Sequence, residues 1–234
     1  MVQSARDEIL EKLRAAPKTA VPPRPGMPPL KDLPLTGEEL VKKFVDTLIE
    51  ETGVVHRVKD PREALDKLAQ IAGEEGLKCV MASTDDVVTL LDLPAWGKKN
   101  GVQVMNPKDF ADRDSFRDAV FDRAQAGITG ADFAVAESGS IGLIHDKDQA
   151  RLVSLAPILH IVILPVERIY PVYEPIIERV FGKNAGAHGG APGEKAPFPS
   201  QFVFITGPSM TGDIQGVLFK GMHGPRKLIV ILIG

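Results

Sequence analysis

The spacing of apolar residues alternates along the first half of the chain between a helical and a strand-like period. After Thr36, apolar positions recur every three or four residues up to Ile49, and the letters TGEE at this start are typical of a capping box. Asp60 and Pro61 give a second helix start, placed between the strand-like runs GVVHRV and LKCVMA. Further on, the pattern predicts helices near DVVTLLDL and DSFRDAVFDRAQ with the strand VQVMN between them. The first half is therefore predicted to be a βα repeat.

Three short runs in the second half are apolar at nearly every position: ILHIVIL, FVFIT and KLIVILI. Such runs are typical of central strands in a sheet that helices cover on both faces. We therefore predict an α/β fold built on a mostly parallel sheet with helices on both faces. All three runs are far shorter than the ~20 residues that cross a bilayer, so no membrane span is expected.

Proline and glycine mark the predicted boundaries. Residues 1–35 are expected to be an N-terminal helix and a proline-rich linker, and residues 36–234 a single α/β domain. The N-terminal arm is either a mobile tail or a subunit contact, and the tail is the commoner case. Residues 182–199, rich in Gly, Pro and Ala, are either an active-site lid or a simple insertion, in which His188 is expected to be solvated.

Composition narrows the classes of partner and compartment. The 234 residues are 44% hydrophobic, enough for one substantial core, and the net charge of -3 provides no basic field for nucleic acid or anionic membranes. The single cysteine, Cys79, cannot by itself form a disulfide or a cysteine-ligated zinc or iron–sulfur site. Because the start also lacks a signal peptide, we expect a cytoplasmic protein.

The segment ADFAVAESGS is the first of two glycine-marked turns. Ser138 and Gly139 suit the tight turn of a hairpin, with Glu137 and Ser140 facing each other across it. The alanines before the turn permit close approach by a helix, a strand or a ligand. Glu137 is then either a solvated carboxylate at a strand end or a positioned nucleophile, general base or hydrogen-bond acceptor.

The segment ITGPSMTGDI is the second of the two glycine-marked turns. A strand is expected to end at Thr206, after which Ser209 or Thr211 can cap a following helix. Ligands of open α/β sheets bind beyond the carboxyl ends of strands, and the free N–H groups of a helix start attract anions. Asp213 can satisfy those donors instead, so an anion site and a self-capped helix both remain open.

Two histidines stand near these turns. His223 lies in a glycine- and proline-bracketed turn, where it is either bonded to nearby backbone or serves as an acid, a base or a ligand contact. His160, inside ILHIVIL, is expected to be buried and hydrogen-bonded to a neighbour. Neither has zinc-ligand spacing, and the sequence contains no HExxH, GxSxG, P-loop or GxGxxG fingerprint where it should stand. No metal site is expected.

The segments ITGADFAVAESGS, SLAPILHIVIL and ITGPSMTGDIQGVLFKGMHGPRKLIVIL together resemble the LUD-domain family, and most closely its lactate-utilization protein C members. The resemblance implies a Rossmann-like fold similar to the phosphosugar isomerase and CoA-transferase superfold. It also implies a role as the subunit without iron–sulfur clusters in a complex that oxidises L-lactate to pyruvate. The clusters would lie on partner subunits, and no cofactor is expected in this chain.

The resemblance further implies that the motifs form one pocket for a small carboxylate or other anionic ligand. Its catalytic candidates are Glu137 and His223. Its ligand-binding candidates are Thr129, Gly130, Ser138, Gly139, Ser140, His160, Gly207, Pro208, Ser209, Thr211, Asp213 and Gly224. The alternative is a stand-alone enzyme on a CoA-transferase-like scaffold that uses Glu137, and a third option is a ligand-sensing protein without chemistry.

Overall fold

The computed structural model describes residues 5–16, 33–181, 201–212 and 218–234. The chain divides into two units, residues 1–30 and 31–234, which are described separately. In the first, helix α1 (Ala5–Ala15) buries none of its residues. The predicted proline-rich linker, the predicted loop over residues 182–199 with His188, and Asp213 lie outside the described residues.

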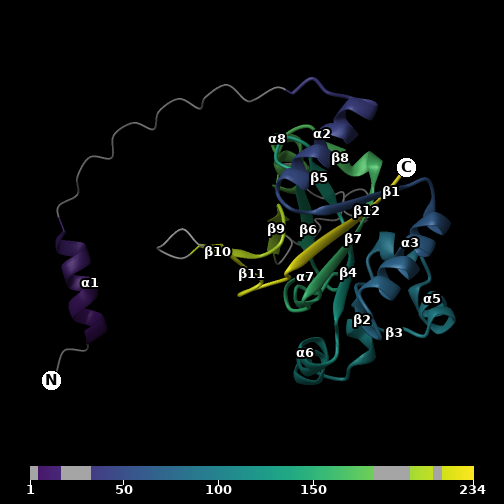
Figure 1. Cartoon of the computed structure of the whole chain (residues 1–234). Coiled ribbons are helices and arrows are strands. Elements are labelled where there is room, and N and C mark those ends of the chain that lie inside the picture. The colour runs from purple at the N-terminus through teal and green to yellow at the C-terminus, as the bar shows by residue number, and fades with distance from the viewer. Residues whose placement is uncertain (1–4, 17–32, 182–200, 213–217) are drawn as a thin grey trace, which may run out of the picture. The chain divides into compact units, whose positions relative to one another are not determined.

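A six-stranded sheet, parallel throughout, forms the centre of the second unit, with strand order β1-β12-β7-β4-β2-β3 (Figure 1). Its strands are β1 (Val54–Val58), β2 (Cys79–Ala82), β3 (Gln103–Met105), β4 (Ala126–Gly130), β7 (Leu159–Pro165) and β12 (Lys227–Ile233). The runs ILHIVIL and KLIVILI become the neighbouring strands β7 and β12, buried along almost their whole length. The predicted α/β fold with a mostly parallel sheet is confirmed.

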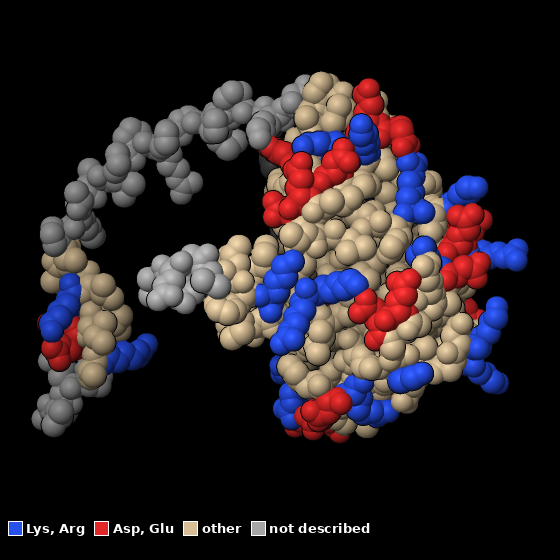
Figure 2. Space-filling view, viewed as in Figure 1, with Lys and Arg blue, Asp and Glu red and all other residues tan. Residues whose placement is uncertain are grey.

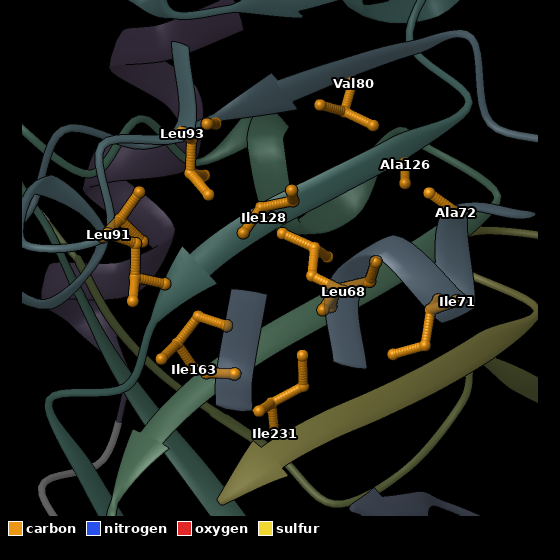
Figure 3. Close-up of a cluster of buried hydrophobic side chains, with 14 of the residues drawn as sticks. Leu68, Ile71, Ala72, Val80, Leu91, Leu93, Ala126, Ile128, Ile163 and Ile231 are labelled. Carbon is orange, nitrogen blue, oxygen red and sulfur yellow. The ribbon is translucent and has the colours of Figure 1, made fainter. Parts of the chain in front are cut away.

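Helices cover both faces of this sheet. They are α2 (Gly37–Glu50), α3 (Pro61–Glu74), α4 (Asp86–Thr89), α5 (Leu93–Asn100), α6 (Arg113–Asp122) and α7 (Leu152–Leu155). Helix α8 (Glu174–Phe181) packs against a second sheet instead. Alternate residues of β7 point to opposite faces. Ile163 joins Leu68 and Ile71 of α3 (Figure 3), whereas Val162 joins the cluster of Phe44 on α2.

The two predicted helix starts differ in how they are capped. Asp60 is the N-cap of α3, and its carboxylate accepts hydrogen bonds from the backbone N–H groups of Arg62 and Glu63, as expected from its sequence. Thr36 is the N-cap of α2 but makes no side-chain cap bond, so the predicted capping box does not form. Gly37 has a positive φ of 54°, which takes the first turn out of the helical geometry that a capping box needs.

A second, four-stranded sheet has the order β8-β5-β6-β9. Its strands are β5 (Phe133–Val135), β6 (Ser140–His145), β8 (Ile169–Tyr170) and β9 (Gln201–Ile205). The prediction that FVFIT is a central parallel strand is wrong, because it forms the edge strand β9, antiparallel to β6. Both faces of β9 are nevertheless apolar, since Phe202 and Phe204 pack into an aromatic cluster beneath α8 while Ile205 packs against the main core.

The chain after β9 forms a hairpin of β10 (Met210–Gly212) and β11 (Leu218–Lys220). The helix expected after the second glycine-marked turn is therefore absent from the described residues, and Thr211 lies in β10 opposite Phe219 instead of capping a helix. The expectation that this turn follows the carboxyl end of a parallel strand is also wrong, since β9 belongs to the antiparallel sheet.

Two further observations concern the charge of the surface and the length of the helices. On the face shown in Figure 2, Lys and Arg side chains are interspersed with Asp and Glu, so that face carries no large field of a single sign. Within the described ranges, every helix is too short or too polar to cross a bilayer.

Candidate functional site

A cavity of about 420 Å³ brings the second glycine-marked turn together with the turn of His223 and with His160. It lies at the amino ends of β7 and β12, between α7 and β9. The volume falls within the range of small-molecule sites, which typically have apolar walls and a few polar groups. The walls follow this pattern, and the predicted residues that line them are His160, Gly207, Pro208, Ser209, His223 and Gly224.

Backbone hydrogen bonds hold the second glycine-marked turn against the turn of His223. The N–H of Ser209 donates to the carbonyl of Pro225 at 2.8 Å, and the N–H of Gly221 donates to the carbonyl of Ser209 at 2.8 Å. A Cβ on Gly224 would lie 3.1 Å from the Cβ of Ser209, so only glycine fits here without displacing the serine. The relative position of the two turns is therefore fixed by local packing.

The first glycine-marked turn reaches the same cavity through a chain of hydroxyl groups. The Ser138 hydroxyl lies 2.5 Å from that of Tyr173, which lies 2.8 Å from that of Ser140. The Ser140 hydroxyl lies 2.8 Å from that of Thr206, a residue of the cavity wall. Gly139, with φ 62°, allows this turn to rest on α2, since a Cβ there would lie 2.6 Å from the Leu48 nitrogen.

Glu137 is not placed as expected. Val135 pairs with Ser140, so residues 136–139 form the turn and Glu137 lies within it, not across from Ser140. The Glu137 backbone N–H donates to the carbonyl of Pro171 at 3.0 Å, and its side chain is half-buried. Glu137 is not among the described residues that line the cavity.

His160 is buried, with a side chain that is 1% exposed, and its Nε2 lies 2.9 Å from the Thr129 hydroxyl. This confirms the expectation of a buried histidine bonded to a neighbour. Burial, and secondarily the positive charge of His145, lower the pKa of His160 to about 3, so its imidazole is neutral at physiological pH. No described residue pairs with its Nδ1.

The ionisable groups of the cavity wall are few. His223 is exposed at the rim, and Glu51 lines the wall where α2 ends. Among the described lining residues there is no lysine or arginine. An anionic ligand would therefore depend on donors such as the Ser209 hydroxyl and the His223 imidazole, not on a lysine or arginine.

Some predicted residues lie elsewhere. Gly130 ends β4 at the opposite end of the sheet, where its N–H donates to Asp85 at 2.9 Å. Thr211 belongs to β10 and is not among the described lining residues. The described part of the chain contains no group of three or more His, Cys, Asp or Glu side chains arranged to hold a metal ion.

The sequence analysis did not predict Glu51 and Tyr173 as site residues, because neither stands in a local sequence pattern that indicates a site.

Comparisons with known proteins agree with this architecture. The model of the family described as the LUD domain matches residues 41–233. Lactate utilization protein C from Deinococcus radiodurans is 27% identical over 236 residues, which cover 100% of this chain and 99% of that protein. The protein of the same name from Bacillus subtilis is 37% identical over 112 residues, covering 48% of this chain and 43% of that protein.

A solved structure shares the fold. The crystal structure of a DUF162 family protein from Deinococcus radiodurans superposes with a TM-score of 0.56 at 21% identity, covering 86% of this chain and 100% of that one. At this identity the likeness supports the architecture alone.

Proposed function

The chain belongs to the LUD domain family. From this membership and the cavity, we propose that it acts in lactate utilization by binding a small carboxylate between the second glycine-marked turn and the turn of His223. One observation carries the proposal. The similarity to the lactate utilization protein C of Deinococcus radiodurans runs over the whole of this chain, and so includes every segment that lines the cavity.

The chemistry of the walls suits a ligand of the lactate or pyruvate type. The hydroxyls of Thr206 and Ser209 and the imidazole of His223 are donors for a carboxylate or hydroxyl group. Leu155 and Leu228 supply apolar surface for a methyl group.

We further propose that the chain works as the subunit without iron–sulfur clusters in a complex that oxidises L-lactate to pyruvate. The single cysteine of the sequence supports this division of labour, because the electron carriers would have to lie on partner subunits. A groove next to the cavity also supports it. Phe121, Ile158 and Met222 line this groove with their side chains largely exposed, and His223 and Gly224 line both spaces.

Growth on L-lactate tests the proposal. In a bacterium that lacks its own lactate utilization protein C and has no other lactate dehydrogenase, this chain is expected to restore growth on L-lactate. Gly224→Ala, which presses on Ser209, should fail to restore it. Gly212→Ala is the matched control, since the nearest atom to its Cβ is 3.8 Å away.

Two outcomes would overturn the proposal. One is an absence of growth with the wild-type chain when its partner subunits are co-expressed from the same source. The other is equal growth with both glycine variants, combined with no heat of binding when L-lactate or pyruvate is titrated into the purified chain.

The alternative, a stand-alone CoA-transferase-like enzyme that uses Glu137, is less well supported, because Glu137 stands outside the cavity wall. Glu137→Gln is accordingly expected to restore growth on L-lactate as well as the wild type does. Loss of growth in this variant, with normal folding, would favour the enzyme.

A further inference from the structure

A second cavity, of about 630 Å³, lies at the opposite end of the parallel sheet. The segments that follow three strands of this sheet line it: Asp85 and Asp86 come after β2, Asp132 after β4, and Arg168 after β7. The segment after β6 of the second sheet adds Gln149. This is the carboxyl end of the strands, where open α/β sheets bind their ligands. None of its described lining residues lines the cavity of His160 and His223.

The charges around this second cavity are predominantly negative. Its described lining residues include six carboxylates and two arginines: Asp85, Asp86, Asp132, Asp146, Asp148, Glu167, Arg168 and Arg179. Both arginines already have partners. Arg168 pairs with Asp86 and donates to the Ala131 carbonyl at 2.9 Å, and Arg179 donates to the Tyr170 hydroxyl at 2.9 Å.

Gln149 provides an independent indication of a ligand site. Its side chain lines the cavity, is 2% exposed and donates from Nε2 to the Gly130 carbonyl at 3.0 Å. Exchanging its amide oxygen and nitrogen would set two oxygens against each other, so the Gly130 carbonyl fixes the orientation. Its Oε1 has no hydrogen-bond partner among the described residues. A buried acceptor left unsatisfied is unfavourable, and a donor on a ligand would satisfy it.

Asp132 adds a carboxylate to the same wall. Its Oδ2 accepts a hydrogen bond from the Ile144 N–H at 2.7 Å. Burial raises the pKa of Asp132 to about 7, opposed mainly by that hydrogen bond, while the charges of Asp85 and Asp86 raise it and that of Arg168 lowers it. A positively charged group in the cavity would therefore favour the ionised form of this side chain.

We propose that this second cavity binds a small organic cation whose ammonium group donates hydrogen bonds to Asp132 and Gln149. The surplus of carboxylates supplies the charge, and the amide oxygen supplies an acceptor that only a donor can satisfy. An ammonium fits better than a metal ion, because no described group of His, Cys, Asp or Glu side chains has metal-binding geometry. This site is independent of the proposed lactate cavity.

Calorimetric titration of the full chain with 1,4-diaminobutane tests the proposal, with 1,4-butanediol as the neutral analogue of equal length and MgCl₂ as the metal control. The diamine is expected to bind and the diol and Mg²⁺ to show no heat. Asp132→Asn should weaken diamine binding about tenfold or more, as expected for the loss of one charge-assisted hydrogen bond. Gln149→Leu, which removes the acceptor together with the amide that donates to the Gly130 carbonyl, should weaken it in the same direction.

Two controls separate this site from others. Asp148→Asn removes a carboxylate at the rim that is already occupied by Lys108 and Lys147, and is expected to change diamine affinity less than about twofold. Gly224→Ala, in the other cavity, should leave diamine binding unchanged.

Equal binding of diol and diamine, or unchanged affinity in both Asp132→Asn and Gln149→Leu, would overturn the proposal. If Asp132→Asn does not fold, Gln149→Leu alone decides between these outcomes. Binding of Mg²⁺ without binding of the diamine would also overturn it and would identify a metal site instead.

Discussion

The hydroxyl oxygens of Ser140 and Thr206 lie 2.8 Å apart, although 66 residues separate them in the chain. The antiparallel pairing of β6 with β9, which sets Ile141 opposite Ile205, places them one position further along the same ladder. The contact joins the two glycine-marked turns, and through Thr206 it links the hairpin of Ser140 to the wall of the first cavity.

This contact predicts a coupled loss of stability. Ser140→Ala and Thr206→Val should each lower the free energy of unfolding by about 1–2 kcal/mol, because each leaves a buried or half-buried hydroxyl with fewer partners. The double variant should lose less than the sum of the two. Urea denaturation of the four proteins measures the coupling. As a control, Thr206→Val combined with Ser115→Ala, at the distant start of α6, should be additive; additivity in both pairs would show that the contact contributes nothing.

Gly139 predicts a strongly position-dependent cost of adding one methyl group. Gly76 has φ 64° and open space around it, so Gly76→Ala is expected to cost only the backbone strain of about 1–2 kcal/mol. At Gly139, with φ 62°, an added Cβ would lie 2.6 Å from the backbone nitrogen of Leu48, so Gly139→Ala must also displace the hairpin from α2. We expect it to cost at least about 2 kcal/mol more than Gly76→Ala in urea denaturation. Similar costs at the two positions would contradict the tight packing on α2.

The raised pKa of Asp132 leads us to expect that the effect of its substitution on stability depends on pH. Its folded-state pKa of about 7 lies above the ordinary value of 3.8, so its contribution to stability is present below pH 3.8 and is lost as the pH rises through 7. The groups that act on it are Asp85, Asp86 and Arg168, together with the Ile144 N–H. Because asparagine does not titrate, Asp132→Asn should gain stability relative to the wild type between about pH 4 and pH 8.

Thermal or urea unfolding at several pH values measures this difference. A difference that stays constant across the range would show that Asp132 titrates normally in the folded chain.

His160 predicts the opposite pH dependence. Its pKa of about 3 lies below the ordinary 6.5, so the unfolded chain takes up a proton first, and the stability contributed by the neutral imidazole is lost as the pH falls from 6.5 towards 3. His160→Gln, which does not titrate, should therefore be more destabilising at about pH 7 than at about pH 4. Urea denaturation at both values measures the change. A cost that is equal at both would mean that His160 takes up its proton over the same pH range in the folded and the unfolded chain.

Much of the fold follows from local patterns. Periodicity located the strands β1, β2 and β3 and the helices α2, α3, α4 and α6, but not α5. Asp60 with Pro61 marked the start of α3, because a cap depends on residues a few positions apart. The burial of His160 followed from its place in an apolar run in the same way. The first glycine-marked turn was recognisable because the positive φ of Gly139 favours glycine.

Pairing between distant segments determined the other features of the fold and of the two cavities. The apolar run FVFIT predicts a central parallel strand, because an apolar run indicates that both faces of a strand are buried. It does not indicate which elements bury them. In the structure, the aromatic cluster under α8 covers one face of this edge strand. The register of β5 and β6 places Glu137 within the turn, and the cavity of Asp132 and Gln149 joins segments that follow four strands. Neighbouring residues thus establish which segments become strands, helices and turns. Which of these segments meet is settled by the folded chain alone, because it depends on contacts between residues far apart in the sequence.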